Sequence, residues 1–248
     1  IFDTYKNKKI IISGSSAIDI TIHALKYLVG RVIIVNFWPF DKDEIRTAFP
    51  NFTEKELYDY YATYGGYPRV AIASNNEERK VILKNIYNTY FLREVKDILG
   101  LVDEYKIQKL LIYLAQSVGS NINYSKLANA CEINKRDVRK YLEFMSKTFV
   151  VYLVMPFFTN KLKEIVKQPK TYFFDVGFLN HILSYEVSAG KKLEQVILME
   201  LIKIGFDIKY WRDKRNREID FVVYKDNKVI TAIESKSSGR YTESFNAF

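Results

Sequence analysis

The chain has 248 residues, of which 48% are hydrophobic and 27% charged, and this balance is typical of a folded globular protein and not of a disordered one. Its single cysteine, Cys131, excludes an internal disulfide framework and favours a reducing, cytoplasmic environment. The formal net charge of +9 favours a nucleic-acid partner without excluding other partners.

The two ends of the chain resemble cuts within a longer protein. Residues 1–4 (IFDT) carry neither an initiator methionine nor a signal-peptide pattern, and residues 244–248 (SFNAF) end without a natural stop. No apolar run approaches the roughly 18–20 residues that span a bilayer. We therefore expect a piece of a cytoplasmic protein, with further sequence upstream and no membrane partner.

The first 40 residues have the pattern strand, helix, strand. The apolar runs at 9–13 and 32–37 are rich in β-branched residues, as in the buried strands of a parallel sheet. Between them, residues 18–28 have apolar positions at helical spacing, and Gly30 closes the predicted helix. We therefore expect residues 1–40 to be the end of an α/β domain.

Residues 41–100 are predicted to be mainly helical. Thr53 precedes Glu56 by three residues, and this capping-box pattern predicts the start of a helix. The predicted segments are a helix at 44–49 that Pro50 stops, a helix at 54–63, a turn at 65–68 and a long amphipathic helix at 77–98.

Residues 101–175 carry three helical patterns followed by two short runs of strand type. Apolar residues recur at i, i+3, i+4 and i+7 from Ile107 and again from Val138. The predicted segments are helices around 107–114, at 124–131 and after Asn134, and strands at 149–154 and 171–174. Three helices and a two-stranded hairpin form the winged-helix arrangement.

The remaining residues predict one helix and then three strands. The segments are a helix through 193–201, strands at 207–212, 217–224 and 228–236, and turns at 214–216 and 226–227. Strand alternation places Glu218 and Asp220 on one face, and Glu234 and Lys236 together on the next strand. Pairing through the second turn lets Asp220 face Glu234.

Carboxylates and a lysine in this pattern suit phosphodiester chemistry. Carboxylate oxygens are ligands for Mg²⁺, which activates a water and neutralises charge at phosphorus. A lysine two residues after the second acid can position that water or stabilise the charged phosphate. The upstream helix offers a further carboxylate, Glu194.

Asp220 followed by Glu234-Ser235-Lys236 resembles the D…(D/E)xK signature of restriction-endonuclease-like nucleases, although Ile219 stands where that family usually has a proline. The whole chain resembles archaeal or bacterial AAA-type ATPases that carry a C-terminal domain of unknown function with a restriction-endonuclease-like core. The matching stretches are GSS at 14–16, GR at 30–31, YGGYP at 64–68, FLREV at 91–95, PKTYFFDVG at 169–177, GKKLE at 190–194, YWR at 210–212, EIDF at 218–221 and IESK at 233–236.

The resemblance implies an α/β fold, α+β over the whole chain, in four parts. These are the end of an AAA-type ATPase core (1–40), a helical lid or linker (41–100), a winged-helix domain (101–175) and a truncated restriction-endonuclease-like domain (176–248).

The resemblance also implies site residues. Glu194, Asp220, Glu234 and Lys236 form the catalytic set, and the three acids are the Mg²⁺ ligands. Ser15 and Arg31 correspond to nucleotide-sensing positions of the ATPase. The chain has no GxxxxGK[ST] phosphate loop, so we expect ATP to bind only in the full-length parent, whose ATPase part is expected to form homo-oligomers.

Two basic clusters suit a DNA backbone. Cations on the third helix lie away from its apolar stripe, as in a recognition helix, and a second cluster precedes Asp220. The predicted DNA-binding residues are Lys135, Arg136, Arg139 and Lys140, with Arg212, Lys214 and Arg215. Ordinary solubilising charge, or a winged helix used for protein contacts, is the alternative for the first cluster, and a solvated hairpin tip is the alternative for the second.

The leading hypothesis is a DNA-binding C-terminal region of an AAA-type ATPase with a Mg²⁺-dependent endonuclease-like domain. One alternative is a catalytically inactive nuclease-fold module that binds DNA or protein and regulates the ATPase. Another is a purely protein-binding regulatory domain. Cleavage with Mg²⁺ separates the first from the second, and salt-dependent DNA binding separates both from the third.

Overall fold

The computed structural model describes residues 11–13, 31–92, 104–158, 164, 167–183, 187–226 and 228–236. The fold is mixed α+β, with helices and a five-stranded mixed sheet, in agreement with the predicted class. The chain divides into two compact units, Ile1–Phe37 and Trp38–Phe248. The helices and strands named below all belong to the second unit.

The described part of the first unit departs from the prediction. Residues 32–37 are in no strand, and Ile33 and Phe37 are 90% and 92% exposed. The predicted strand is therefore wrong in this chain, because a strand needs a paired neighbour and the described residues supply none. Of the nucleotide-sensor pair, Arg31 is exposed, and Ser15 lies outside the described residues.

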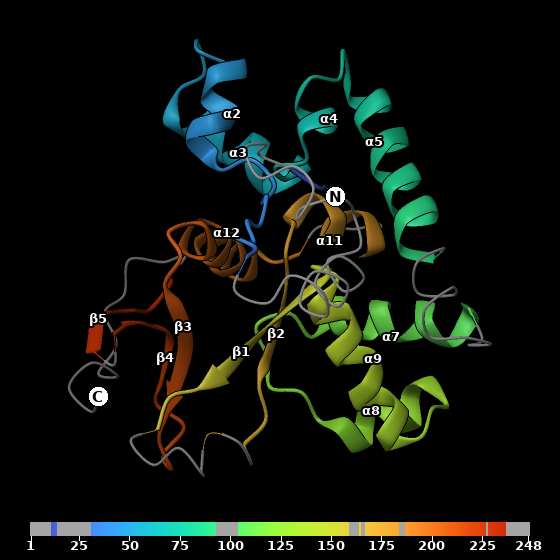
Figure 1. Cartoon of the computed structure of the whole chain (residues 1–248), viewed down its shortest axis with the longest axis vertical. Coiled ribbons are helices and arrows are strands. Elements are labelled where there is room, and N and C mark those ends of the chain that lie inside the picture. Colours follow the sequence, from blue (N-terminus) through green and yellow to red (C-terminus); the bar gives the residue numbers. More distant parts are fainter. Residues whose placement is uncertain are drawn as a thin grey trace. The chain divides into compact units, whose positions relative to one another are not determined.

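The second unit begins with a series of helices (Figure 1). They are α2 (Lys42–Ala48), α3 (Glu54–Tyr64), α4 (Pro68–Ala71) and α5 (Asn76–Asn85), followed by the π-helix η1 (Ile86–Leu92). The predicted capping box of Thr53 and Glu56 is confirmed, and Asp41 with Glu44 forms a second one that starts α2 earlier than predicted. The predicted single helix at 77–98 is interrupted after Asn85, where hydrogen bonding changes to the wider π spacing through Leu92, and residues 93–98 lie outside the described residues.

The three helices predicted next are confirmed. They are α7 (Glu104–Gln116), α8 (Tyr124–Cys131) and α9 (Lys135–Lys147). Asn123 and Asn134 cap α8 and α9 by accepting backbone N–H bonds. Val138, Leu142 and Met145 are buried as the periodicity predicts, and so is Cys131.

One sheet contains the strands from both halves of the second unit. The strands are β1 (Val151–Pro156), β2 (Lys170–Phe173), β3 (Asp207–Arg212), β4 (Glu218–Lys225) and β5 (Lys228–Ile233), in the spatial order β2-β1-β3-β4-β5. All neighbours are antiparallel except β1 and β3, which pair in parallel through Met155 and Pro156. In Figure 1 the sheet extends from β2, beside the yellow β1, to the red β5. The predicted boundary between residues 175 and 176 therefore falls between strands of one sheet.

Two further helices, α11 (Val176–Leu183) and α12 (Ala189–Lys203), join the sheet to the helical segment. Buried side chains from α2, α3, α11 and α12 form one apolar core, including Ile45, Leu57, Val176 and Met199. No pattern in the sequence predicted α11. No helix in the described part is long and apolar enough to cross a membrane.

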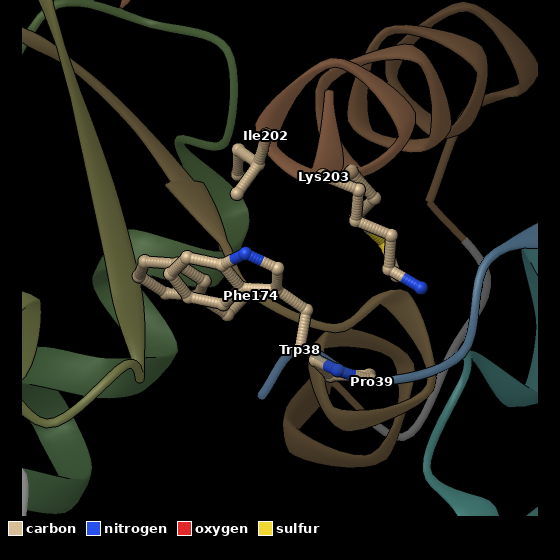
Figure 2. Close-up of a pocket in the computed structure, with 6 residues that line it drawn as sticks. Trp38, Pro39, Phe174, Ile202 and Lys203 are labelled. Carbon is tan, nitrogen blue, oxygen red and sulfur yellow. The ribbon is translucent and has the colours of Figure 1, made fainter. Parts of the chain in front are cut away.

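A small pocket lies beside Trp38 (Figure 2). The indole of Trp38 stacks on Phe174, with 5.4 Å between ring centroids, and Ile202 and Lys203 of α12 complete the wall. Its volume of about 10 Å³ is close to the space of one water molecule. The pocket is a packing gap between α12 and the sheet and not a ligand site.

Candidate acidic centre and basic helix

Three carboxylates converge on one buried lysine. Lys170 at the start of β2 is 1% exposed, and its Nζ lies 3.3 Å from Glu194 Oε1 on α12 and 3.3 Å from Asp220 Oδ1 on β4. Glu218 on β4 also pairs with Lys170. We refer to Lys170, Glu194, Glu218 and Asp220 as the acidic centre.

Hydrogen bonds between the neighbouring Gln195 and β2 explain why Glu194 lies beside Lys170. The neighbouring Gln195 is fully buried, and its amide accepts from Phe173 N–H at 2.9 Å and donates to Phe173 C=O at 2.5 Å. These bonds occupy backbone groups of β2 and hold α12 against that strand. Glu194 is thereby placed beside Lys170 and beside Tyr172, whose hydroxyl donates to the same carboxylate.

Strand alternation explains why Glu218 and Asp220 share this site. Ile219 and Phe221 are fully buried on the opposite face of β4, so the two acids point together toward Lys170. The register Phe221↔Ile233, continued by one residue, places Asp220 opposite Glu234. Asp220 Oδ2 accepts from both the N–H and the hydroxyl of Ser235, each at 2.8 Å.

Burial and charge act against each other in the acidic centre. Burial lowers the pKa of Lys170, but Glu194, Glu218 and Asp220 outweigh it, and the net pKa of the ammonium is raised. Burial raises the pKa of Glu194; Lys170 lowers it, Asp220 raises it further, and the net shift is upward. The lysine is therefore held charged at neutral pH.

The four predicted catalytic residues lie near one another, in two pairings. Glu194 and Asp220 meet at Lys170, whereas Glu234 pairs with Lys236 at 2.7 Å. Glu234 is the main cause of a raised pKa of Lys236, and Asp220 and Glu194 add to it, so Lys236 lies within electrostatic reach of the acidic centre.

The described side chains do not fit a divalent ion as they stand. Among the residues that the structure describes, no group of three or more His, Cys, Asp or Glu side chains is arranged to hold a metal. The reason is visible in the contacts: the point where Glu194 and Asp220 converge is taken by an ammonium. Both oxygens of Asp220 already have donors, from Lys170 and from Ser235.

Sequence reasoning missed Lys170 and Tyr172. Both stand in the run KTYFF at 170–174, for which the sequence predicted only a strand at 171–174. A lysine inside a buried strand is a signal that could have been used, because a fully buried lysine needs a counter-charge.

The predicted recognition helix, α9, carries a basic outer face. Lys135, Arg136, Arg139 and Lys140 are exposed, and Val138 beneath them is fully buried. Within the described part of the chain, none of these four cations forms a salt bridge; Arg139 lies over the ring of Tyr124 at 5.1 Å. The helix therefore presents uncompensated positive charge to solvent.

The second predicted basic cluster is divided. Arg212 pairs with Glu218 of the acidic centre, and so it is committed to an internal ion pair. Lys214 and Arg215 lie exposed in the β3–β4 turn. Arg212 is also exposed, at 41%, but within the described residues only Lys214 and Arg215 of this cluster lack an ion-pair partner.

Two family models match the chain. Residues 55–189 match the family described as a domain of unknown function (DUF8612), and residues 189–248 match another domain of unknown function (DUF4143). The second match agrees with the expected C-terminal domain of unknown function. No solved structure matches the chain.

Curated relatives match along most of the chain and are likewise uncharacterised. A protein of Haemophilus influenzae is 23% identical over 90% of this chain and 58% of its own length. A protein of Methanocaldococcus jannaschii is 25% identical over 90% of this chain and 54% of its own length. One of Mycobacterium tuberculosis is 22% identical over 87% of this chain and 49% of its own length. The chain thus spans about half the length of the relatives it matches.

Proposed function

Because the chain belongs to the family described as a domain of unknown function (DUF8612), its activity has to be argued from its own residues, and we propose that it is a DNA-binding module that contacts the phosphate backbone through α9. The observation that carries the proposal is the solvent-facing row Lys135, Arg136, Arg139 and Lys140. Cations without an internal partner break no ion pair when they bind phosphate. Their binding also releases the counterions of DNA, which favours association.

Local structure supports this use of α9. The helix follows α8 after a short connection, and Asn134 caps it so that its first turn is fixed. Lys135 and Arg136 occupy that first turn, where backbone N–H groups also favour anions. The long, flexible Lys and Arg side chains suit phosphates more than base edges, so we propose binding with little sequence preference.

The test is DNA binding by the triple variant Lys135→Ala/Arg136→Ala/Lys140→Ala. We expect its affinity for duplex DNA to fall at least tenfold, and the slope of log affinity against log salt to become shallower by about 2 to 3, because each lost phosphate contact contributes about 0.9. Fluorescence anisotropy across a salt series measures both quantities.

A charge-matched control separates a binding surface from net charge. Lys55, Arg69 and Lys84 are also exposed, and they lie on the helices α3, α4 and α5. Replacing these three residues by alanine removes the same charge. We expect this control variant to keep most of the slope of log affinity against log salt. Equal losses in the two triple variants would contradict the assignment to α9, and no binding by wild type would reject the proposal.

The partner of this module is proposed to be an ATPase domain. The domain matched by residues 189–248 is often found at the C-terminus of AAA ATPase-like proteins, and the relatives extend well beyond this chain. One polypeptide would then carry both the ATPase domain and the DNA-binding helix α9. The cytoplasmic location and the homo-oligomer remain predictions.

Metal-dependent cleavage of DNA is a second candidate. The observation in its favour is that Glu194 and Asp220 lie within 3.3 Å of one shared cation position, with Lys236 nearby. Against it, that position is occupied by Lys170, so the set does not fit Mg²⁺ in this arrangement. We therefore place it second.

The same DNA substrates test the second candidate. Incubation with Mg²⁺ or Mn²⁺ should leave supercoiled, linear and single-stranded DNA intact if the module only binds. Cleavage that disappears in Asp220→Ala, while binding persists, would establish the second candidate in place of a pure binding module.

A further inference from the structure

The acidic centre already contains a cation supplied by the chain itself. Lys170 is 1% exposed, and its ammonium meets carboxylates from α12 and from β4. The ring centroid of Tyr210 lies 5.6 Å from the same Nζ, which closes another side with an aromatic face. An ammonium buried this deeply is stable only with such partners, and the carboxylates equally need it.

The second oxygens of Asp220 and Glu218 also have donors within the chain. Asp220 Oδ2 takes two bonds from Ser235 at 2.8 Å, and Glu218 pairs through its other oxygen with Arg212. Tyr172 donates to Glu194 Oε1, the oxygen that also faces Lys170. These three donors thus do part of what bound water does in an open carboxylate site.

The distances show what kind of cation the centre is built around. Nζ lies 3.3 Å from oxygens of Glu194 and Asp220, whereas Mg²⁺ binds oxygen at about 2.0–2.1 Å and Ca²⁺ at about 2.3–2.6 Å. A divalent ion would require Lys170 to leave and the carboxylates to move inward. The larger Ca²⁺ requires the smaller movement.

We propose that Lys170 is a built-in cation, which occupies the divalent-ion position of the acidic centre and makes it independent of metal. The lysine also ties β2 to α12 and β4, so it holds the β1–β2 hairpin against the C-terminal strands. This inference goes beyond DNA binding by α9 and does not depend on it. It predicts a metal site that appears only when the lysine is removed.

The experiment compares wild type with Lys170→Met, which has similar length and no charge. We expect wild type to have the same Tm in EDTA and in CaCl2, and to bind no Ca²⁺ by titration calorimetry. Lys170→Met should have a lower Tm in EDTA, regain much of it in CaCl2 or MnCl2, and bind one Ca²⁺ with an affinity at least tenfold above the detection limit at which wild type shows no binding.

Two further variants isolate the cause. Lys228→Met removes an exposed lysine of β5 that lies outside the acidic centre, and it should behave as wild type. Lys170→Met/Asp220→Asn removes one carboxylate as well, and it should lose the gained affinity for Ca²⁺.

Two results would overturn the inference. The first is that wild type binds Ca²⁺ or Mn²⁺ and Asp220→Asn abolishes this binding. The second is that Lys170→Met folds but gains no affinity for Ca²⁺. If Lys170→Met does not fold, the wild-type titration still decides, because a built-in cation requires that wild type bind no ion there. Every readout is metal binding or Tm, so failure here is distinguishable from failure of DNA binding.

Discussion

Asp175 is a fully enclosed carboxylate that links two distant segments. Its Oδ1 accepts from Phe178 N–H at 2.9 Å, which caps α11, and its Oδ2 accepts from Gly66 N–H at 2.7 Å. Burial raises the pKa of Asp175 to about 6, although the backbone donors of Gly66, Phe178 and Gly177 lower it. The desolvation cost of the buried carboxylate is therefore offset by two hydrogen bonds, which no local sequence pattern predicts.

Stability should depend on pH through Asp175. The folded pKa of about 6 lies above the ordinary 3.8, so the contribution of this group is greatest below about pH 4 and is lost as pH rises through 6. Asp175→Asn cannot titrate. The free energy of unfolding of wild type minus that of the variant should thus fall by roughly 2 kcal/mol between pH 4 and pH 7.

Urea unfolding at a series of pH values measures this difference. Asp43→Asn, at an exposed aspartate of α2, is the matched control for the substitution itself. A difference that stays constant across the range would contradict the assignment of the pH dependence to Asp175.

At the scale of elements, the end of α3 and the start of α11 lie so close together that only a glycine fits at the end of α3. Gly65 has φ +72° and ψ −160°, a region open essentially to glycine alone, and a Cβ there would lie 2.2 Å from Asp175 Oδ1. Asn180 of α11 also donates to the carbonyls of Ala62 and Thr63 at the end of α3. This junction connects the helical segment to α11 and, through the shared core, to α12.

Gly65→Ala should destabilise the protein much more than Gly205→Ala. Both glycines have positive φ, but nothing lies within 4 Å of a Cβ at Gly205. We expect a loss of about 1 kcal/mol at Gly205, from backbone strain, and of about 3 kcal/mol or more at Gly65, where a clash is added. Denaturant midpoints measure both, and equal losses would mean that the contact with Asp175 relaxes freely.

At the scale of the molecule, the five-stranded sheet joins the parts of the second unit, which begins at Trp38. The parallel pairing of β1 with β3 joins the predicted winged-helix strands to the C-terminal strands, and Lys170 adds ion pairs from β2 to α12 and β4. Trp38 packs on Phe174 beside α12, whereas Trp211 lies in β3. The two tryptophans therefore report on different parts of this unit.

Unfolding of this unit should be a single transition. Trp211→Phe leaves Trp38 as the fluorescent reporter, and Trp38→Phe leaves Trp211. In each variant the fluorescence midpoint in urea should coincide with the midpoint by circular dichroism, because one sheet unfolds cooperatively. A reproducible separation between the fluorescence and circular dichroism midpoints would mean that the predicted boundary at 175/176 divides two independent domains.

The sequence alone determined the features that depend on near neighbours. The capping box at Thr53, the caps at Asn123 and Asn134 and the alternation of Glu218 and Asp220 each involve residues a few positions apart. Such contacts carry little loop entropy, so the local pattern specifies them. The closeness of Glu194 to Asp220 was also anticipated, through the family resemblance.

Only the tertiary structure decided what stands between those acids. Lys170 meets Glu194 and Asp220 from 24 and 50 residues away, and its pattern in the sequence is that of a lysine within an apolar strand. The parallel pairing of β1 with β3 is equally remote, and its strands are separated by α11 and α12. Contacts of this kind are selected by how whole elements pack, and the composition of one segment does not encode them. The tertiary structure therefore showed that a lysine from another strand meets two of the acids predicted as metal ligands.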